Sequence, residues 1–151
     1  MRIAVNTRLL LKDKLEGIGW FTFEVFSRIV KAHPEHEFLF FFDRSYAKEF
    51  VFANNVTPIV LFPQARHPLL FNFWFDYSVT KALKRYQADI FFSPDGMLSL
   101  KTKIPQITVI HDLNFEHRRY EKYLCMNNMM PCKQCNREQK THPNETEPAM
   151  L

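Results

Sequence analysis

Residues 37–43 read Glu37-Phe38-Leu39-Phe40-Phe41-Phe42-Asp43, five consecutive apolar residues bounded by two carboxylates. The segment is too short for a helix. A short run that is apolar without alternation is typical of a strand buried on both faces. Strands of this kind occur in parallel sheets that are covered by helices. The segment therefore predicts a buried strand of a parallel sheet.

The segments on either side of this strand alternate between strand and helix patterns. Upstream, residues 2–6 predict a first strand. A helix that Pro34 ends is predicted next by apolar residues at three- and four-residue intervals, namely Ile18, Phe21, Val25 and Ile29, with Phe26 and Val30 widening the stripe. Downstream, the pattern predicts a short helix at 46–53, strands at 57–62, 88–92 and 105–110, and a helix from 68 to about 86. This order predicts an α/β fold in which a mainly parallel sheet is covered on both faces.

The pattern changes near residue 118. Residues 1–117 form the predicted domain. Residues 118–151 carry three prolines and many polar residues, without a sustained apolar period. Such a segment buries too little apolar surface to offset its loss of conformational entropy. We therefore expect 118–151 to be a disordered or poorly packed tail.

Composition and charge exclude several classes of protein. The chain has 151 residues, of which 46% are hydrophobic, and its formal net charge is +4. These values exclude a wholly disordered or collagen-like chain. The weak positive charge permits attraction to phosphate or anionic lipid but does not require nucleic acid. The longest apolar run is far shorter than the roughly 20 residues of a spanning helix, and the first residues lack the layout of a signal peptide. A cytoplasmic location is therefore expected.

The aromatic residues of the segment 68–86 allow two interpretations. Packing on the sheet accounts for Phe73, Trp74 and Tyr77 but not for Phe71 and Phe75. The alternative is a weak, peripheral contact with a membrane surface, aided by cations of the same region. These cations are Arg66, Lys81, Lys84 and Arg85. We favour packing in the core.

Three polar segments follow predicted strands: residues 6–19, 93–96 and 111–112. In an open parallel sheet, ligands bind beyond the carboxyl ends of the strands, where the strand order reverses. If the three strands are neighbours, these segments line one crevice. Gly17-Ile18-Gly19 precedes the helix, where free N–H groups favour an anion such as phosphate. A plain loop-to-helix turn is the alternative.

The other two segments supply side chains with possible chemistry. His111 could orient a hydroxyl or exchange a proton, and Asp112 could fix its tautomer or bind a sugar hydroxyl. A turn without a ligand is the alternative for this pair. Asp95 stands beside Gly96 and is interpreted first as a turn residue, with ligand binding as the alternative.

A zinc site in the tail is a weaker hypothesis. Its four ligands would be Cys125, Cys132, Cys135 and His142. Structural zinc sites usually have two closely spaced pairs, whereas here only Cys132 and Cys135 are two residues apart. We therefore predict no metal for the candidate site itself.

Four segments together resemble the N-terminal domain of retaining GT-B glycosyltransferases, in particular glycosyltransferase family 4. They are residues 2–8 (RIAVNTR), 16–19 (EGIG), 88–96 (ADIFFSPDG) and 105–113 (PQITVIHDL). In that family, two Rossmann-like α/β/α domains close around a nucleotide-sugar donor. The N-terminal domain mostly binds the acceptor, a glycan or a lipid-linked molecule, as in polysaccharide biosynthesis.

The resemblance also implies roles for residues of this chain. Gly17, Ile18 and Gly19 would lie by the donor phosphates and the acceptor, with Asp95 at the same site. His111 would lie near the transferred sugar as the catalytic residue, with Asp112 beside it. Transfer would retain the anomeric configuration and would need neither a metal-binding Asp-x-Asp motif nor a cofactor beyond the nucleotide-sugar.

The chain departs from this family after residue 117. The family's C-terminal domain, with its two glutamates seven residues apart, has no counterpart in the sequence. We therefore expect a partial glycosyltransferase, inactive alone, of the kind that a frameshift or premature stop produces. One alternative is a non-catalytic binding module that needs a partner chain or self-associates through an exposed sheet edge. Another is a fragment of a nucleotide-dependent oxidoreductase, which the missing third glycine after the first strand disfavours.

Overall fold

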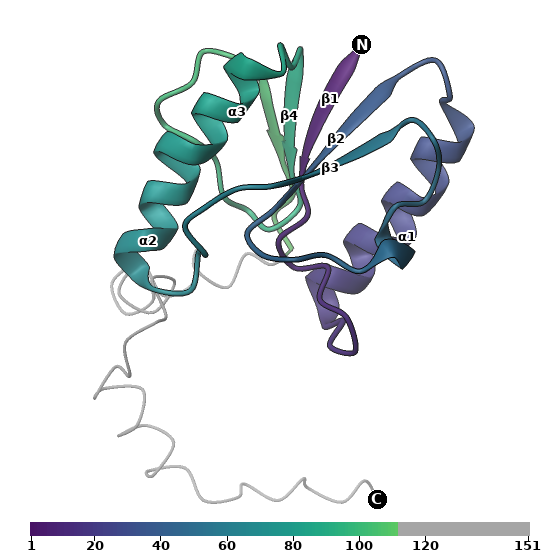
Figure 1. Ribbon diagram of the computed structural model, residues 1–151, viewed down its shortest axis with the longest axis horizontal. Coiled ribbons are helices and arrows are strands. Elements are labelled where there is room, and N and C mark those ends of the chain that lie inside the picture. Colours follow the sequence, from purple (N-terminus) through teal and green to yellow (C-terminus); the bar gives the residue numbers. More distant parts are fainter. Residues whose placement is uncertain (112–151) are drawn as a thin grey trace, which may run out of the picture. The chain divides into compact units, whose positions relative to one another are not determined.

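Five parallel strands form one sheet in the computed structural model, which describes residues 1–111 (Figure 1). The strands are β1 (Arg2–Asn6), β2 (Glu37–Phe42), β3 (Val56–Val60), β4 (Ile90–Ser93) and β5 (Gln106–Thr108). Their spatial order is β3-β2-β1-β4-β5, and all four neighbouring pairs are parallel. The predicted α/β fold with a parallel sheet is thus confirmed.

Helical segments connect these strands. They are α1 (Gly17–Ala32), the 3-10 turn η1 (Lys48–Phe50), α2 (Pro68–Phe73), the π-helical segment η2 (Trp74–Val79) and α3 (Thr80–Arg85). In Figure 1, α1 lies on one side of the sheet, and α2 and α3 lie on the other. The order of elements agrees with the sequence pattern. The short helix expected at 46–53 is only a single 3-10 turn.

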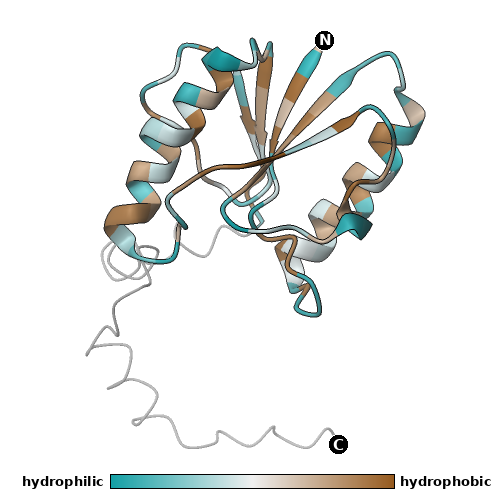
Figure 2. Ribbon diagram, viewed as in Figure 1, coloured by the Kyte–Doolittle hydropathy of each residue, from teal (hydrophilic) through white to brown (hydrophobic). Residues whose placement is uncertain are grey.

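Alternate residues of β2 face the two sides of the sheet. Phe38, Phe40 and Phe42 pack with Phe26 and Val30 of α1. Leu39 and Phe41 pack in a second cluster with Trp74, Val79 and Leu83. All five apolar residues of β2 are at most 1% exposed. The segment 38–42 is therefore buried on both faces, and the strands are correspondingly apolar in Figure 2.

The structure corrects two predicted helix faces. In α1, the buried side contains Gly19, Thr22, Phe26 and Val30, whereas Ile29 is exposed. In the segment 68–86, Trp74 and Phe75 are buried, and Phe73 and Tyr77 are exposed by 46% and 52%. The expectation that Phe73 and Tyr77 pack in the core was wrong. The side that packs on the core is instead formed by Phe71, Trp74, Phe75, Val79 and Leu83. Phe73 and Tyr77 therefore lie on the outer side, whereas Phe71 and Phe75, which core packing was not expected to explain, belong to the inner one.

Several expectations concern residues that the structure does not describe. The boundary at 117/118, the tail 118–151, Asp112 and the proposed zinc ligands Cys125, Cys132, Cys135 and His142 all lie outside residues 1–111. Within the described range, no helix has the length and apolar character needed to cross a membrane.

Candidate functional site

The strand order reverses between β1 and β4. The connection through α1 leads from β1 to β2 on one side, and β4 lies on the other side of β1. At such a point the connections diverge and leave a crevice at the carboxyl ends of the strands. Because β1, β4 and β5 are neighbours, the loops after β1 and β4 meet at this edge with His111, the described residue of the third predicted segment.

A buried polar network joins the ends of β1 and β4. Asn6 Nδ2 donates to Ser93 Oγ at 3.1 Å, and Ser93 Oγ donates to Asp95 Oδ1 at 2.9 Å. Arg8 Nε donates to Asp95 Oδ2 at 2.8 Å. The Asp95 side chain is only 2% exposed and that of Arg8 15%. Both oxygens of Asp95 are therefore engaged within the protein, which agrees with its interpretation as a turn residue.

Arg8 also connects this network to the other face of the sheet. Its guanidinium carbon lies 4.9 Å from the centre of the Phe71 ring, a cation–π distance. Phe71 in turn borders a hollow of about 300 Å³. The hollow is lined by Phe71, Asn72, Phe75, Asp76, Gly96, Met97, Leu98 and Leu100. It therefore combines apolar and polar walls directly beside the loop that follows β4.

His111 is held at the same edge by two contacts. Its Nε2 lies 2.6 Å from the carbonyl oxygen of Pro94. Because a carbonyl only accepts, Nε2 carries the proton, and Nδ1 of the neutral ring is an acceptor. The ring also packs edge-on against Phe21 of α1, with centroids 5.1 Å apart. The structure thus brings His111 beside the first turns of α1.

The two glycines at the start of α1 differ in their surroundings. A Cβ on Gly17 would meet nothing within 4 Å, whereas a Cβ on Gly19 would lie 2.7 Å from the carbonyl oxygen of Leu9. Ile18 lies between them, and its carbonyl accepts from Thr22 Oγ1 at 2.7 Å. The N-cap residue Glu16 makes no capping hydrogen bond with its side chain. Gly19 therefore permits close packing, and Gly17 leaves the helix start open to a ligand.

A further polar pair at this edge was not singled out in the sequence. Asp43 follows β2, is completely buried, and binds Arg44 through both oxygens at 2.6 and 2.7 Å. These hydrogen bonds raise the pKa of Arg44 above its usual value. Asp43 also accepts from the backbone N–H of Ala65 at 3.1 Å and so holds the loop after β3. The sequence signals for these buried polar groups were a carboxylate directly after an apolar strand, the polar Asn6 at the end of β1 and the nearby Arg8.

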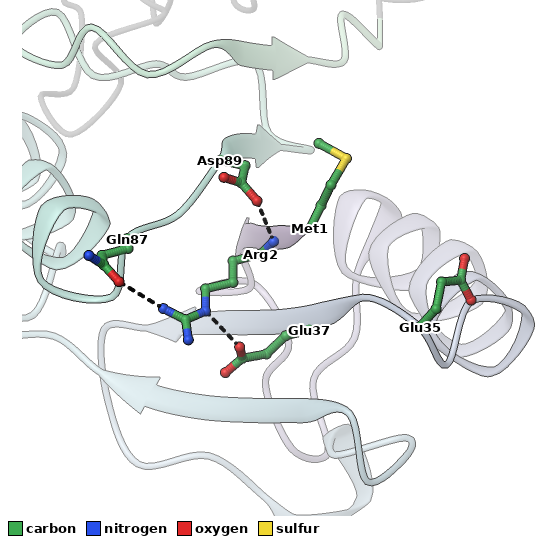
Figure 3. A pocket seen from close by; sticks show the side chains of 6 residues that line it. All are labelled: Met1, Arg2, Glu35, Glu37, Gln87 and Asp89. Carbon is green, nitrogen blue, oxygen red and sulfur yellow. Dashed lines mark hydrogen bonds and ion pairs between the residues drawn. The ribbon is translucent and has the colours of Figure 1, made fainter.

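A larger hollow, of about 480 Å³, lies at the opposite, amino end of the strands (Figure 3). Figure 3 shows Arg2 bound to Glu37 at 2.9 Å and to Gln87 at 3.3 Å. The backbone N–H of Arg2 donates to Asp89 at 2.7 Å. Since these polar groups already have partners, the carboxyl edge remains the candidate site.

No family model, curated protein or solved structure matches this chain.

Proposed function

We propose that residues 1–111 form the acceptor-side domain of a retaining GT-B glycosyltransferase that uses a nucleotide-sugar donor. The observation that carries the proposal is the position of His111. Its ring contacts Phe21 in the first turns of α1. It lies at the edge of the sheet where hydrogen bonds among Asn6, Ser93 and Asp95 join the ends of β1 and β4. Support also comes from the all-parallel sheet and its order, which suit a Rossmann-like half of a GT-B fold.

Each part of this edge has a role in the proposal. The N–H groups at the start of α1, next to Gly17, bind donor phosphate with the help of the helix dipole. His111 Nδ1 accepts a hydrogen bond from a hydroxyl of the transferred sugar. The hollow beside Phe71 and Phe75 receives a glycan or lipid-linked acceptor. Most donor contacts come from a second domain, so this chain binds weakly and does not transfer sugar by itself.

The experiment is an NMR titration of the ¹⁵N-labelled, full 151-residue chain. UDP, UDP-glucose, GDP-mannose and maltotriose are added separately, up to millimolar concentration. We expect the nucleotides to shift the amide signals of Gly17 and Gly19. We expect the sugar-containing probes to shift the ring signals of His111. The same mixtures are assayed for transfer, and no turnover is expected from the chain alone.

Two variants sharpen this titration. His111→Ala should weaken the response to UDP-glucose several-fold while leaving the response to UDP unchanged, since only the sugar contact is removed. The control is Lys31→Ala, which removes an exposed side chain from the last turn of α1, away from the carboxyl edge. Equal responses of both variants, or shifts that fall elsewhere on the sheet, would contradict the proposed site.

A further inference from the structure

Three side chains with metal-binding atoms lie together where α1 passes into β2. His33 is the C-cap residue of α1, and Glu35 and His36 directly precede β2. One ligand atom from each residue lies within 4.8 Å of those of the other two. The cluster is at the amino end of β2 and thus separate from the candidate glycosyltransferase site at the carboxyl ends.

The separations within the cluster fit a metal-bound arrangement. Glu35 Oε1 lies 3.0 Å from His33 Nδ1 and 3.6 Å from His36 Nε2. In a tetrahedral zinc site with bonds of about 2.0–2.2 Å, neighbouring ligand atoms are about 3.4 Å apart. These two distances bracket that value, and the two histidine nitrogens lie within 4.8 Å of each other. A small adjustment of the side chains is therefore enough to place an ion between them.

Asn55 holds the backbone of this turn in place. Its side-chain amide donates to the carbonyl oxygens of Val30, His33 and His36 at 3.0, 3.1 and 3.1 Å. The backbone carbonyl oxygen of Asn55 in turn accepts a hydrogen bond from the backbone N–H of Phe38 in β2. Because one amide fixes the backbone at both histidines, the ligands lose little further entropy when they bind.

Exposure leaves the cluster accessible to an ion. The side chains of His33 and Glu35 are 53% and 58% exposed. In His36, Nδ1 is buried without a hydrogen-bond partner among residues 1–111, so Nε2, which faces Glu35, is the available ligand atom. Within the same range, the Glu35 carboxylate contacts these two imidazoles and forms no ion pair with a lysine or arginine. No cation of the protein therefore competes for its carboxylate there.

We propose that His33, Glu35 and His36 bind a divalent transition-metal ion, best matched by Zn²⁺, with water completing the coordination. Two imidazoles and one carboxylate are donors that zinc accepts, whereas Mg²⁺ and Ca²⁺ prefer sites made of oxygen ligands alone. The bound ion ties the end of α1 to the start of β2. Because the ion binds the folded chain, it stabilises that chain by mass action.

The test is a zinc titration of the full 151-residue chain by isothermal calorimetry. Cys125, Cys132 and Cys135 are replaced by Ser in every sample, because thiolates bind zinc strongly. We expect one ion per chain with micromolar affinity and a higher melting temperature with zinc than without. His33→Ala combined with His36→Ala should lower the affinity at least tenfold and abolish the thermal shift.

The matched control is His67→Ala, which removes an exposed histidine from the N-cap of α2 and should leave zinc binding unchanged. On the chain with its natural cysteines, Ni²⁺ should broaden the amide signals of His33, Glu35, His36, Glu37 and Asn55. Equal zinc affinity with and without His33 and His36, or binding only at millimolar zinc, would overturn the proposal.

Discussion

At the scale of single residues, the carboxyl edge separates groups that hold the loops from groups that can meet a ligand. Asp95 and Arg8 form a mostly buried pair, and removing one partner of such a pair typically costs about 3–5 kcal/mol. Their role is to fix the loop after β4. His111 is exposed, and a Cβ on Gly17 would meet no atom within 4 Å. Of these two, His111 contacts the loop that the buried pair fixes, through the carbonyl oxygen of Pro94.

The two glycines of α1 provide a test at this scale. Gly19→Ala should destabilise the fold by about 1–3 kcal/mol, because the new methyl group meets the backbone oxygen of Leu9 at 2.7 Å. Gly17→Ala should leave stability unchanged or raise it by up to about 1 kcal/mol, since alanine favours the helix and meets no atom within 4 Å. Urea denaturation of both variants measures the difference. Equal losses of stability would contradict the distinct roles of the two positions.

At the scale of elements, the segment α2–η2–α3 has one face in the core and one toward solvent. Trp74 is fully buried, and its Nε1 donates to the carbonyl of Leu61 at 3.1 Å. On the outer side, the rings of Phe73 and Tyr77 stack with centroids 4.9 Å apart. They border a hollow of about 370 Å³ that Lys81 and Arg85 also line. Exposed aromatic rings beside cations suit a weak contact with an anionic membrane surface.

This contact is tested by co-sedimentation with lipid vesicles. The full chain should bind phosphatidylglycerol vesicles weakly and phosphatidylcholine vesicles not at all. Phe73→Ala combined with Tyr77→Ala should lower binding several-fold, because both exposed rings are lost. The control is Trp20→Ala, which removes an exposed aromatic side chain from α1, on the other face of the sheet. If the control lowers binding equally, this outer face is not the contact surface.

At the scale of the whole molecule, the sequence predicted the strands, the helices and the parallel sheet, because these depend on local patterns of apolar residues. The apolar run Phe38–Phe42 indicated a doubly buried strand, and the alternation of patterns indicated the parallel sheet. The outward position of Phe73 was missed, because aromatic residues occur on both sides of this helical segment and the spacing alone does not select the side that faces the sheet. The bond between Asn6 and Ser93 joins residues 87 positions apart, which no local pattern encodes. The location of the site was predictable from the strand ends, but its buried supports were not.

The edges of the sheet bear on the alternative that the chain self-associates. Within residues 1–111, β3 and β5 are the outer strands. Asn55 and Leu61 direct backbone groups to β2, since Asn55 accepts from Phe38 and Leu61 donates to Phe42 at 2.8 Å each. The N–H and C=O groups of successive residues point alternately to the two sides of a strand, so the backbone nitrogen and carbonyl of Pro58 face the open edge. Because proline has no N–H, it interrupts the row of donors there and disfavours pairing with another strand.

Replacing this proline tests the protection of the edge. Pro58→Val restores an outward N–H in the middle of β3 and should give a concentration-dependent dimer, where the unchanged chain stays monomeric. Size-exclusion chromatography with light scattering at about 10 to 300 μM measures the mass, since weak pairing corresponds to affinities of roughly this order. Thr57→Val is the matched control, because it adds an apolar side chain to the same strand without a new donor. If Thr57→Val also forms a dimer, the association comes from added apolar surface and not from the new N–H. If the unchanged chain forms a dimer, Pro58 does not prevent pairing.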